Sequence, residues 1–534
     1  MTTSILFSGG TIVDGRGTPP RRGDVLVQGD KITRVTDGAE AISADRVIDI
    51  SGLTIAPGFI DMHTHSDLQI LCNPDHTAKL SQGVTTEVLG QDGLSYAPVN
   101  DATLAELRSQ LKGWNDDPPG FDWNWRSVGE YLARLDGRTA TNCAYLVPHG
   151  NLRMMVMGNA DRLATPDELE EMKALLRQAM EEGGVGLSTG LTYVPAMYSD
   201  TDELVALCEV VAEYGGFYCP HHRNYGADAM GGYRECFEIA RRAGVALHLA
   251  HCHLSFDCNR GKLPALISMI DTAIAEGVDV SFDSYPYLAG MTTLLSQLPS
   301  WALEGSGDEQ LARLRDPATR ARIIDALDVS GSDGHQGLTV NWHGVHIAGV
   351  PGAPELEWLM EDNLAACAAK VGKQPAELAL DILLATDRAA PCVFFIGIEA
   401  HIRELMQHPV HTVGSDGILV GDRPHPRSWG TFPRMLETYV RNEKVLTLSE
   451  CIRHMTSSAA RRLRLTDRGA IEEGMLADLV VFNPETVSEK STYADPRQSA
   501  TGIEHVMVNG IFALWEGKVS GERSGRVIRL GNLN

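Results

Sequence analysis

The chain has 534 residues, of which 43% are hydrophobic and 22% are charged, and this favours a globular protein with one large domain and a smaller one. The formal net charge of −24 argues against partners that are themselves anionic, namely nucleic acids and acidic membrane surfaces. No apolar run approaches the roughly 18 residues that a membrane-spanning helix needs.

The start of the chain, residues 1–7, has neither a basic segment nor a long apolar stretch, so no signal peptide is expected. The ten cysteines include no Cys-x-x-Cys pair, which favours reduced thiols over a disulfide framework. We therefore expect a cytoplasmic protein whose partner is a small-molecule substrate. The oligomeric state is left open, with a homo-oligomer as one option.

Both ends of the chain have the pattern of short β-strands. Residues 1–56 contain segments such as 24–30, in which hydrophobic residues are bounded by glycine and aspartate turns. Residues 461–534 have the same character, with strands expected at 477–482 and 506–510. We predict that the two ends together form one small β-sandwich domain.

The region between them, residues 57–460, alternates helices with buried strands. Thr165-Pro166-Asp167-Glu168 is a capping box with proline at the first helical position, and an apolar stripe at helical spacing follows it. Gly183-Gly184 ends this helix, and a strand follows. The same unit of helix, glycine and strand recurs with helices expected near 200–214, 232–243 and 263–276.

This alternation requires a parallel α/β sheet. Three of its strands end in His221, His251 and Asp283. A (β/α)₈ barrel gathers such residues at one mouth, whereas a doubly wound sheet would spread them along a line, so we predict a barrel. Residues 100–145 and 290–400 fit the repeat poorly and are predicted to be insertions that lie over the mouth.

The candidate metal ligands sit at the expected strand ends. His63 and His65 are two apart, so they face the same side of a strand and can bind one ion. His221 and His251 end two later strands, one βα unit apart, and Asp416 follows another short apolar run. Imidazole and carboxylate groups are the ligands of a catalytic zinc site, so the chain is predicted to hold a metal.

The chain also contains phrases that match a known family. They are 57–65 (PGFIDMHTH), 82–86 (QGVTT), 149–153 (HGNLR), 186–191 (GLSTGL), 285–287 (YPY), 415–417 (SDG), 425–427 (HPR), 430–434 (GTFPR) and 474–480 (GMLADLV). On these phrases the sequence resembles the amidohydrolase superfamily, and within it the N-acyl-D-amino-acid deacylases, also called D-aminoacylases. The resemblance implies a barrel with a β-sandwich, and hydrolysis of N-acyl-D-amino acids to a carboxylic acid and a D-amino acid.

The resemblance also implies roles for the candidate ligands. Asp92, His221 and His251 would hold one zinc ion tightly, and the two N-terminal histidines would hold a second, weaker ion. The metal would acidify a water molecule and polarise the amide carbonyl. Asp416 would take the proton of the water and pass it to the leaving nitrogen.

Three further residues are expected to contact the substrate. Arg427 is similar to the family arginine that pairs with the substrate carboxylate, for which a guanidinium group is suited, and Arg423 is a nearby competitor. Tyr193 and Tyr285 resemble family tyrosines that position the substrate. All three residues are therefore predicted to bind substrate.

Two positions depart from the family pattern. The deacylases usually carry a cysteine ligand where this chain has Asp92, and a carboxylate can bridge two ions and shifts the preference toward Mn²⁺ or Co²⁺. Met291 stands where the deacylases tend to have a serine near the substrate carboxylate. These departures keep an alternative open, namely hydrolysis of another amide, a lactam, a carbamate or a cyclic ureide on the same site.

Overall fold

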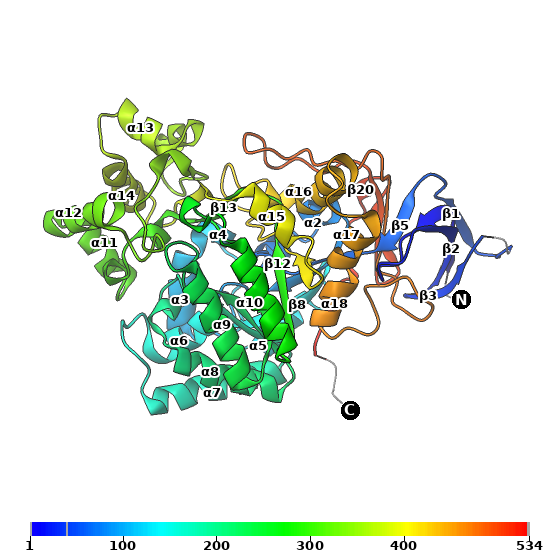
Figure 1. Ribbon diagram of the computed structural model, residues 1–534, viewed down its shortest axis with the longest axis horizontal. Coiled ribbons are helices and arrows are strands. Elements are labelled where there is room, and N and C mark those ends of the chain that lie inside the picture. Colours follow the sequence, from blue (N-terminus) through cyan, green and yellow to red (C-terminus); the bar gives the residue numbers. More distant parts are fainter. Residues whose placement is uncertain (1–2, 39–40, 531–534) are drawn as a thin grey trace.

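The computed structural model describes residues 3–38 and 41–530, and its centre is a parallel eight-stranded barrel (Figure 1). The strands are hydrogen-bonded in the order β16-β12-β11-β10-β9-β8-β7-β6, and each neighbouring pair is parallel. Their bounds are β6 (Phe59–Asp61), β7 (Val84–Leu89), β8 (Asn142–Pro148), β9 (Gly186–Gly190), β10 (Phe217–His221), β11 (Ala246–Leu249), β12 (Val280–Ser284) and β16 (His411–Val413).

The two end strands of this sheet, β6 and β16, meet and close the barrel. Thr64 forms a parallel bridge with Gly417, and the Met62 N–H donates to the Val413 carbonyl at 3.1 Å. The predicted (β/α)₈ barrel is therefore confirmed. Closure matters for function because it brings the residues after the first and last strands side by side.

Helices on the outside of the barrel connect successive strands, as the sequence predicted. The Thr165–Glu168 capping box is present, with both of its reciprocal hydrogen bonds, and it begins the longest of these helices. Figure 1 shows the four helices along the outside of the barrel. Their bounds are α7 (Pro166–Glu181), α8 (Thr201–Glu213), α9 (Ala229–Ala243) and α10 (Leu263–Ala275).

The two chain ends build a separate sheet, which Figure 1 shows beside the barrel, near the N-terminus of the chain. It has nine strands, and β5 joins the two ends by pairing antiparallel with β17. The bounds are β1 (Ser4–Ile12), β2 (Arg21–Gln28), β3 (Lys31–Thr36), β4 (Arg46–Asp49), β5 (Thr54–Pro57), β17 (Leu479–Phe482), β18 (Ile503–Val508), β19 (Ile511–Trp515) and β20 (Lys518–Val519).

The longest excursion from the barrel lies between β12 and β16. It carries a small antiparallel sheet in the order β13-β15-β14, and a helical layer with an apolar core of its own. Figure 1 shows this helical layer at one end of the molecule, away from the terminal sheet. The bounds are β13 (Ala289–Thr293), β14 (Val345–Ile347), β15 (Pro391–Phe395), α11 (Gly307–Arg315), α12 (Pro317–Asp325), α13 (Leu364–Lys370) and α14 (Pro375–Ala385).

The remaining helices fill the connections near the barrel ends. Within residues 3–38 and 41–530, no helix is long and apolar enough to cross a membrane. The bounds are α1 (Gln69–Cys72), α2 (Thr77–Leu80), α3 (Asp101–Gln110), α4 (Lys112–Asn115), α5 (Val128–Leu135), α6 (His149–Met157), α15 (Glu399–Leu405), α16 (Arg427–Arg434), α17 (Leu448–Met455) and α18 (Ser457–Arg462).

Candidate metal centre and its pocket

His63 and His65 lie just beyond the carboxyl end of β6, at the mouth of the barrel. Both side chains are buried, and their ring centres are 5.4 Å apart. His63 Nε2 lies 3.5 Å from Asp92 Oδ1, and His65 Nε2 lies 3.5 Å from Asp92 Oδ2. The two imidazoles of the His-x-His pair are thus directed at one carboxylate.

A buried ion pair holds the His-x-His segment against the segment that follows β16. Lys79 Nζ lies 2.6 Å from Asp61 Oδ2. The Ser415 backbone N–H and hydroxyl donate to the two Asp61 carboxylate oxygens at 2.8 and 2.6 Å. The Asp416 N–H then donates to the His63 carbonyl at 2.7 Å. The Lys79–Asp61 pair, through its bonds to Ser415, therefore holds Asp416 beside the two histidines.

Asp92 lies in a tight turn after β7 and reaches the centre of the site. Its φ is 54°, in the left-handed region that aspartate tolerates better than most residues. The turn packs directly on the end of β9, where a Cβ at Gly190 would lie 2.1 Å from the Asp92 carbonyl oxygen. Glycine at 190 is therefore needed for Asp92 to occupy this position.

His221 and His251 complete the ring of imidazoles around Asp92. His221 Nδ1 lies 3.3 Å from Asp92 Oδ2, and His251 Nε2 lies 3.5 Å from Asp92 Oδ1. Each histidine is oriented from behind: His221 Nε2 lies 2.7 Å from Thr192 Oγ1, and His251 Nδ1 lies 3.1 Å from Tyr225 Oη. Such outer hydrogen bonds are typical of metal-binding histidines.

Two groups of side chains in the described residues share Asp92. One comprises His63, His65, Asp92 and Asp416, the other Asp92, His221 and His251, and the ligand atoms of each lie within 4.8 Å of one another. His63 Nε2 and Asp92 Oδ1 are buried without a hydrogen-bond partner. Because unpaired buried polar atoms are costly, this donor set fits a metal ion, and the shared carboxylate suits two.

The carboxylates set the protonation of the cluster. Burial acts to lower the pKa of His65, but Asp416 and Asp92 outweigh it and raise that pKa to about 9. Burial acts to raise the pKa of Asp92, but the charges of His221, His251 and neighbouring His63 hold it well below its usual range. Asp92 is therefore ionised, and the cluster concentrates negative charge at the point where the histidines converge.

Asp416 is paired with Arg427 as well as with the histidines. Arg427 Nη1 lies 2.9 Å from Asp416 Oδ2, and Asp416 Oδ1 lies 3.2 Å from His65 Nε2. Burial acts to raise the pKa of Asp416, but Arg427 and the nearby histidines lower it overall. Arg427 is fully buried behind Tyr285, outside the pocket lining, so its contact with a substrate carboxylate stays a prediction.

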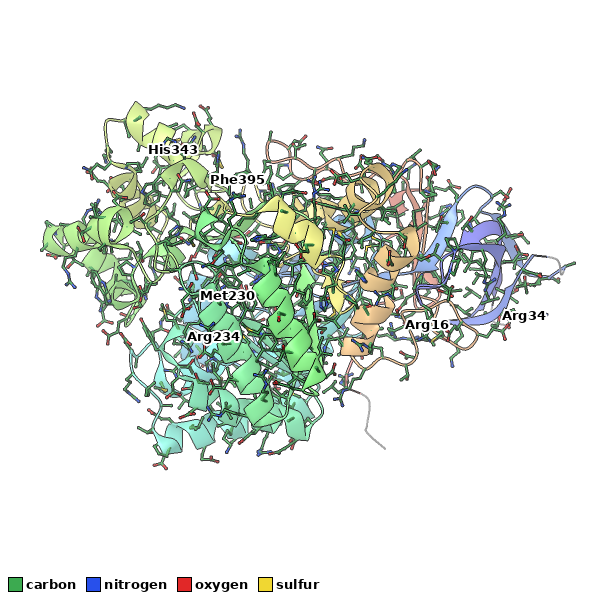
Figure 2. The ribbon with its side chains drawn as sticks, in the orientation of Figure 1. Arg16, Arg34, Met230, Arg234, His343 and Phe395 are labelled. Carbon is green, nitrogen blue, oxygen red and sulfur yellow. The ribbon has the colours of Figure 1, made fainter. Side chains whose placement is uncertain are left out.

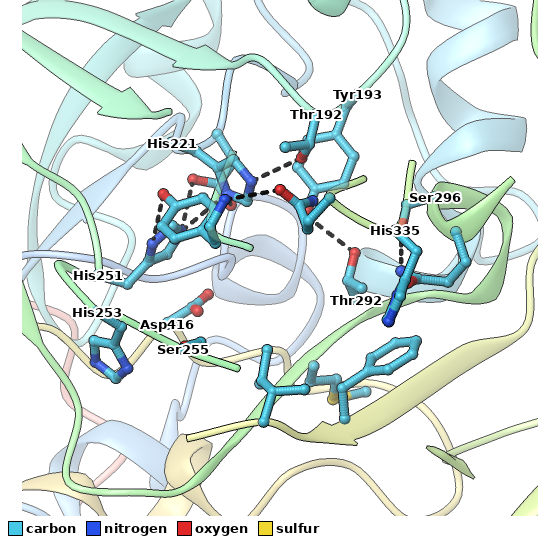
Figure 3. A pocket seen from close by; sticks show the side chains of 18 of the residues that line it. Thr192, Tyr193, His221, His251, His253, Ser255, Thr292, Ser296, His335 and Asp416 are labelled. Carbon is cyan, nitrogen blue, oxygen red and sulfur yellow. Dashed lines mark hydrogen bonds and ion pairs between the residues drawn. The ribbon is translucent and has the colours of Figure 1, made fainter. Parts of the chain in front are cut away.

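A cavity of about 120 Å³ opens beside the cluster. Tyr193 and Tyr285, which the sequence predicted as substrate contacts, both line it, and Trp114 packs its ring 4.9 Å from that of His65. Figure 3 shows Tyr193 on the wall near His221. His253 also lines the cavity.

Other contributors to the site have weak sequence signals or none. Thr192 directly precedes Tyr193 and follows the matching phrase 186–191, but the sequence analysis did not name it. Tyr225, which contacts His251, lies in a loop after β10 without a distinctive pattern. The cavity wall that faces away from the barrel comes from the excursion between β12 and β16, for which the sequence predicted a place over the mouth and singled out Tyr285 and Met291 but not the other lining residues.

Comparisons with known proteins relate nearly the whole chain to one family. The amidohydrolase family matches residues 46–512. A D-aminoacylase from Alcaligenes xylosoxydans xylosoxydans is 34% identical, over 98% of this chain and 97% of that protein. An N-acyl-D-glutamate deacylase from the same organism is also 34% identical, over 98% of this chain and 96% of that protein.

Two solved structures are similar over almost the whole chain. A D-aminoacylase crystal structure has a TM-score of 0.82 and 32% identity, and the match covers 99% of this chain and 100% of the other. The N-acyl-D-glutamate deacylase of Bordetella bronchiseptica, solved with zinc and a phosphonate mimic of the tetrahedral intermediate, has a TM-score of 0.84 at 32% identity, with coverage of 99% and 100%. This chain therefore belongs to the amidohydrolase family.

Proposed function

We propose that this protein is a metal-dependent hydrolase that cleaves the amide bond of N-acyl-D-amino acids, releasing a carboxylic acid and a D-amino acid. The observation that carries the proposal is the ring of four histidines around a shared Asp92, with Asp416 at its edge and a pocket beside it. The similarity to D-aminoacylase and to N-acyl-D-glutamate deacylase over nearly full length supports the choice of substrate class.

In this proposal Asp92, His221 and His251 hold one zinc ion, and His63 and His65 contribute to a second, weaker position. Mn²⁺ or Co²⁺ are alternatives, because a carboxylate is a harder ligand than the family cysteine. A bound ion supplies positive charge that acidifies a water molecule and polarises the scissile carbonyl.

Asp416 is the proposed catalytic residue. Its carboxylate is ionised and lies beside His65, where it can accept a proton from the attacking water and deliver it to the leaving nitrogen. Tyr193 and Tyr285 would position the substrate from the pocket wall, and Arg427 would attract its carboxylate from behind Tyr285.

The test is amine release from matched N-acetyl-D- and N-acetyl-L-amino acids by the metal-loaded enzyme. Turnover of the D series, lost in Asp416→Asn with the metal retained, is the expected result. An enzyme that binds metal but cleaves neither series contradicts the proposal, and lactams, carbamates and cyclic ureides are then the substrates to examine.

A further inference from the structure

The far wall of the pocket is made by the excursion between β12 and β16, and its chemistry differs from that of the metal side. Figure 3 shows His335 and Ser296 across the pocket from His251. Apolar side chains and uncharged polar side chains alternate on this wall. They include Met291, Ser296, Gln297, His335, Phe394 and Ile396, and Thr292 and Gln336 also line this wall.

No lysine or arginine lines the cavity in the part of the chain that the structure describes. Arg427 lies behind Tyr285, is paired with Asp416, and is assigned in the proposed function to the α-carboxylate of the substrate. Arg388 belongs to a neighbouring cavity of about 30 Å³ beyond Tyr193, where its two terminal nitrogens donate to Gln310 and to a serine hydroxyl. The wall therefore offers no cation to a second carboxylate on the substrate.

A chain of hydrogen bonds fixes which atoms this wall presents to the cavity. The Ser296 hydroxyl donates to the Thr293 carbonyl at 2.8 Å, so its oxygen is free to accept from Gln297 Nε2, which is also 2.8 Å away. This orients the Gln297 amide and leaves its Oε1 facing His335 Nδ1 at 2.5 Å. An amide oxygen only accepts hydrogen bonds, so His335 Nδ1 is the donor.

The other nitrogen of His335 is therefore an acceptor. Burial lowers the pKa of His335 to about 4, so the ring is neutral and carries one proton, which the bond to Gln297 places on Nδ1. The Nε2 lone pair has no hydrogen-bond partner among the described residues, and the ring lines the cavity. The polar feature that His335 offers a ligand is thus a hydrogen-bond acceptor.

We propose that the pocket accepts N-acyl-D-amino acids with uncharged side chains, that His335 Nε2 accepts a hydrogen bond from side chains that carry a donor, and that side chains ending in a carboxylate are rejected. This inference rests on the proposed deacylase function and names its substrate class. With acetyl as the acyl group, the amino-acid side chain is the longer branch beyond the scissile bond, and it fills the rest of the cavity.

The physical reason is the difference between an amide and a carboxylate of nearly equal shape. A glutamine side chain brings an NH₂ donor that matches His335 Nε2. A glutamate side chain brings only acceptors to an acceptor, and it buries a charge beside apolar residues without a cation. We expect a discrimination of about 100-fold, the order of effect that follows when a buried polar group is left without a partner.

The first experiment compares kcat/KM for N-acetyl-D-methionine, N-acetyl-D-glutamine and N-acetyl-D-glutamate with metal-loaded wild-type enzyme. Methionine and glutamine derivatives are expected to be cleaved, and the glutamate derivative about 100-fold more slowly than glutamine. If N-acetyl-D-methionine is cleaved and N-acetyl-D-glutamate is cleaved as fast as N-acetyl-D-glutamine or faster, this inference is wrong and the proposed function stands. Failure to cleave any N-acyl-D-amino acid overturns the proposed function and this inference with it.

Two substitutions at position 335 test separately the hydrogen-bond acceptor on His335 and the lack of a cation for a substrate carboxylate. His335→Phe removes the acceptor, so the ratio of glutamine to methionine turnover should fall about tenfold, the value of one hydrogen bond. His335→Arg supplies the missing cation, so the ratio of glutamate to glutamine turnover should rise about 100-fold. Unchanged ratios in both folded variants contradict the proposal.

His343 provides the matched control, because it lies in the same excursion and is exposed, as Figure 2 shows. His343→Phe and His343→Arg should leave all three substrate ratios as in the wild type. Circular dichroism and thermal melting establish that each variant is folded. Where a His335 variant does not fold, the wild-type comparison of glutamine with glutamate decides the proposal.

Discussion

The pocket has two halves that were built in different ways. The barrel half is made of strand ends, and it gathers four histidines and two carboxylates into two groups that share Asp92, with the ligand atoms of each group within 4.8 Å of one another. The half from the excursion between β12 and β16 presents apolar side chains, amides and a neutral imidazole. In our proposal the barrel half provides the chemistry, whereas the excursion selects the substrate.

The two halves also differ in how they are supported. Buried ion pairs fix the positions of the residues in the barrel half. Examples are the pairs Lys79–Asp61 and Arg427–Asp416. The excursion relies on its own apolar core and on neutral hydrogen bonds such as that between Gln297 and His335. Substitutions in the barrel half should therefore change activity and acid stability, and those in the excursion should change substrate ratios.

The largest effect is expected from Asp92→Ala. Asp92 belongs to both ligand groups, so its loss should release metal from both and lower activity by about 1,000-fold or more, because the metal contributes several kcal/mol to the reaction. Metal content by inductively coupled plasma mass spectrometry gives the readout. His221→Ala should affect only one group, so equal metal loss in the two variants would contradict the sharing of Asp92.

Asp416→Asn should lower kcat by about 100- to 10,000-fold, the contribution of a positioned acid–base group, while at least one metal ion stays bound. The measurement is kcat on N-acetyl-D-methionine together with metal content. Asp422→Asn serves as the control because Asp422 is exposed and outside the pocket. A wild-type rate in Asp416→Asn would remove this residue from the mechanism.

Glu87 should make the stability of the barrel half depend on pH. Burial acts to raise the pKa of Glu87, but His76, Lys79 and Thr141 outweigh it and lower that pKa to about 2. The folded-state pKa is depressed, so the contribution of Glu87 is present above the unfolded value of about 4.5 and is lost as the pH falls toward 2. Its full size is about 3 kcal/mol.

Urea unfolding at pH 7, 4 and 3 tests this prediction. Wild-type enzyme should lose part of its free energy of unfolding between pH 4 and 3, and Glu87→Gln should be less stable at pH 7 with a flatter dependence below pH 4.5. Glu472 pairs with Arg16 on the surface, so Glu472→Gln should change stability by no more than about 1 kcal/mol. A Glu87→Gln profile parallel to the wild type contradicts the proposed effect.

The smallest effect is expected where the two halves touch. Tyr193 Oη lies 3.0 Å from Thr292 Oγ1, a contact between the barrel side and the excursion. Tyr193→Phe removes one neutral hydrogen bond, so KM should rise about tenfold or less. Thr292→Val should give a similar rise. If the double variant shows the sum of the two free-energy changes, the hydrogen bond does not couple the halves.

Local patterns in the sequence were sufficient to predict much of the barrel half. The Thr165 capping box and the glycine stops predicted the helices, and strand-end histidines such as His221 and His251 predicted where a metal cluster would form. These signals are readable because they depend on hydrogen bonds and spacings between residues close in the chain. Asp92 was identified from the resemblance, as the position where the deacylases carry a cysteine ligand.

Only the tertiary structure decided the positions of side chains that depend on contacts between distant segments of the chain. The place of Asp92 among four histidines depends on a left-handed turn pressed against Gly190, almost 100 residues away. The pairing of Arg427 with Asp416, and the line of hydrogen bonds that turns His335 Nε2 toward the pocket, join segments that no local pattern relates. The sequence therefore indicated a metal-dependent hydrolase and most of its candidate ligands, and only the folded chain decided how Asp92, Arg427 and His335 are placed around the pocket.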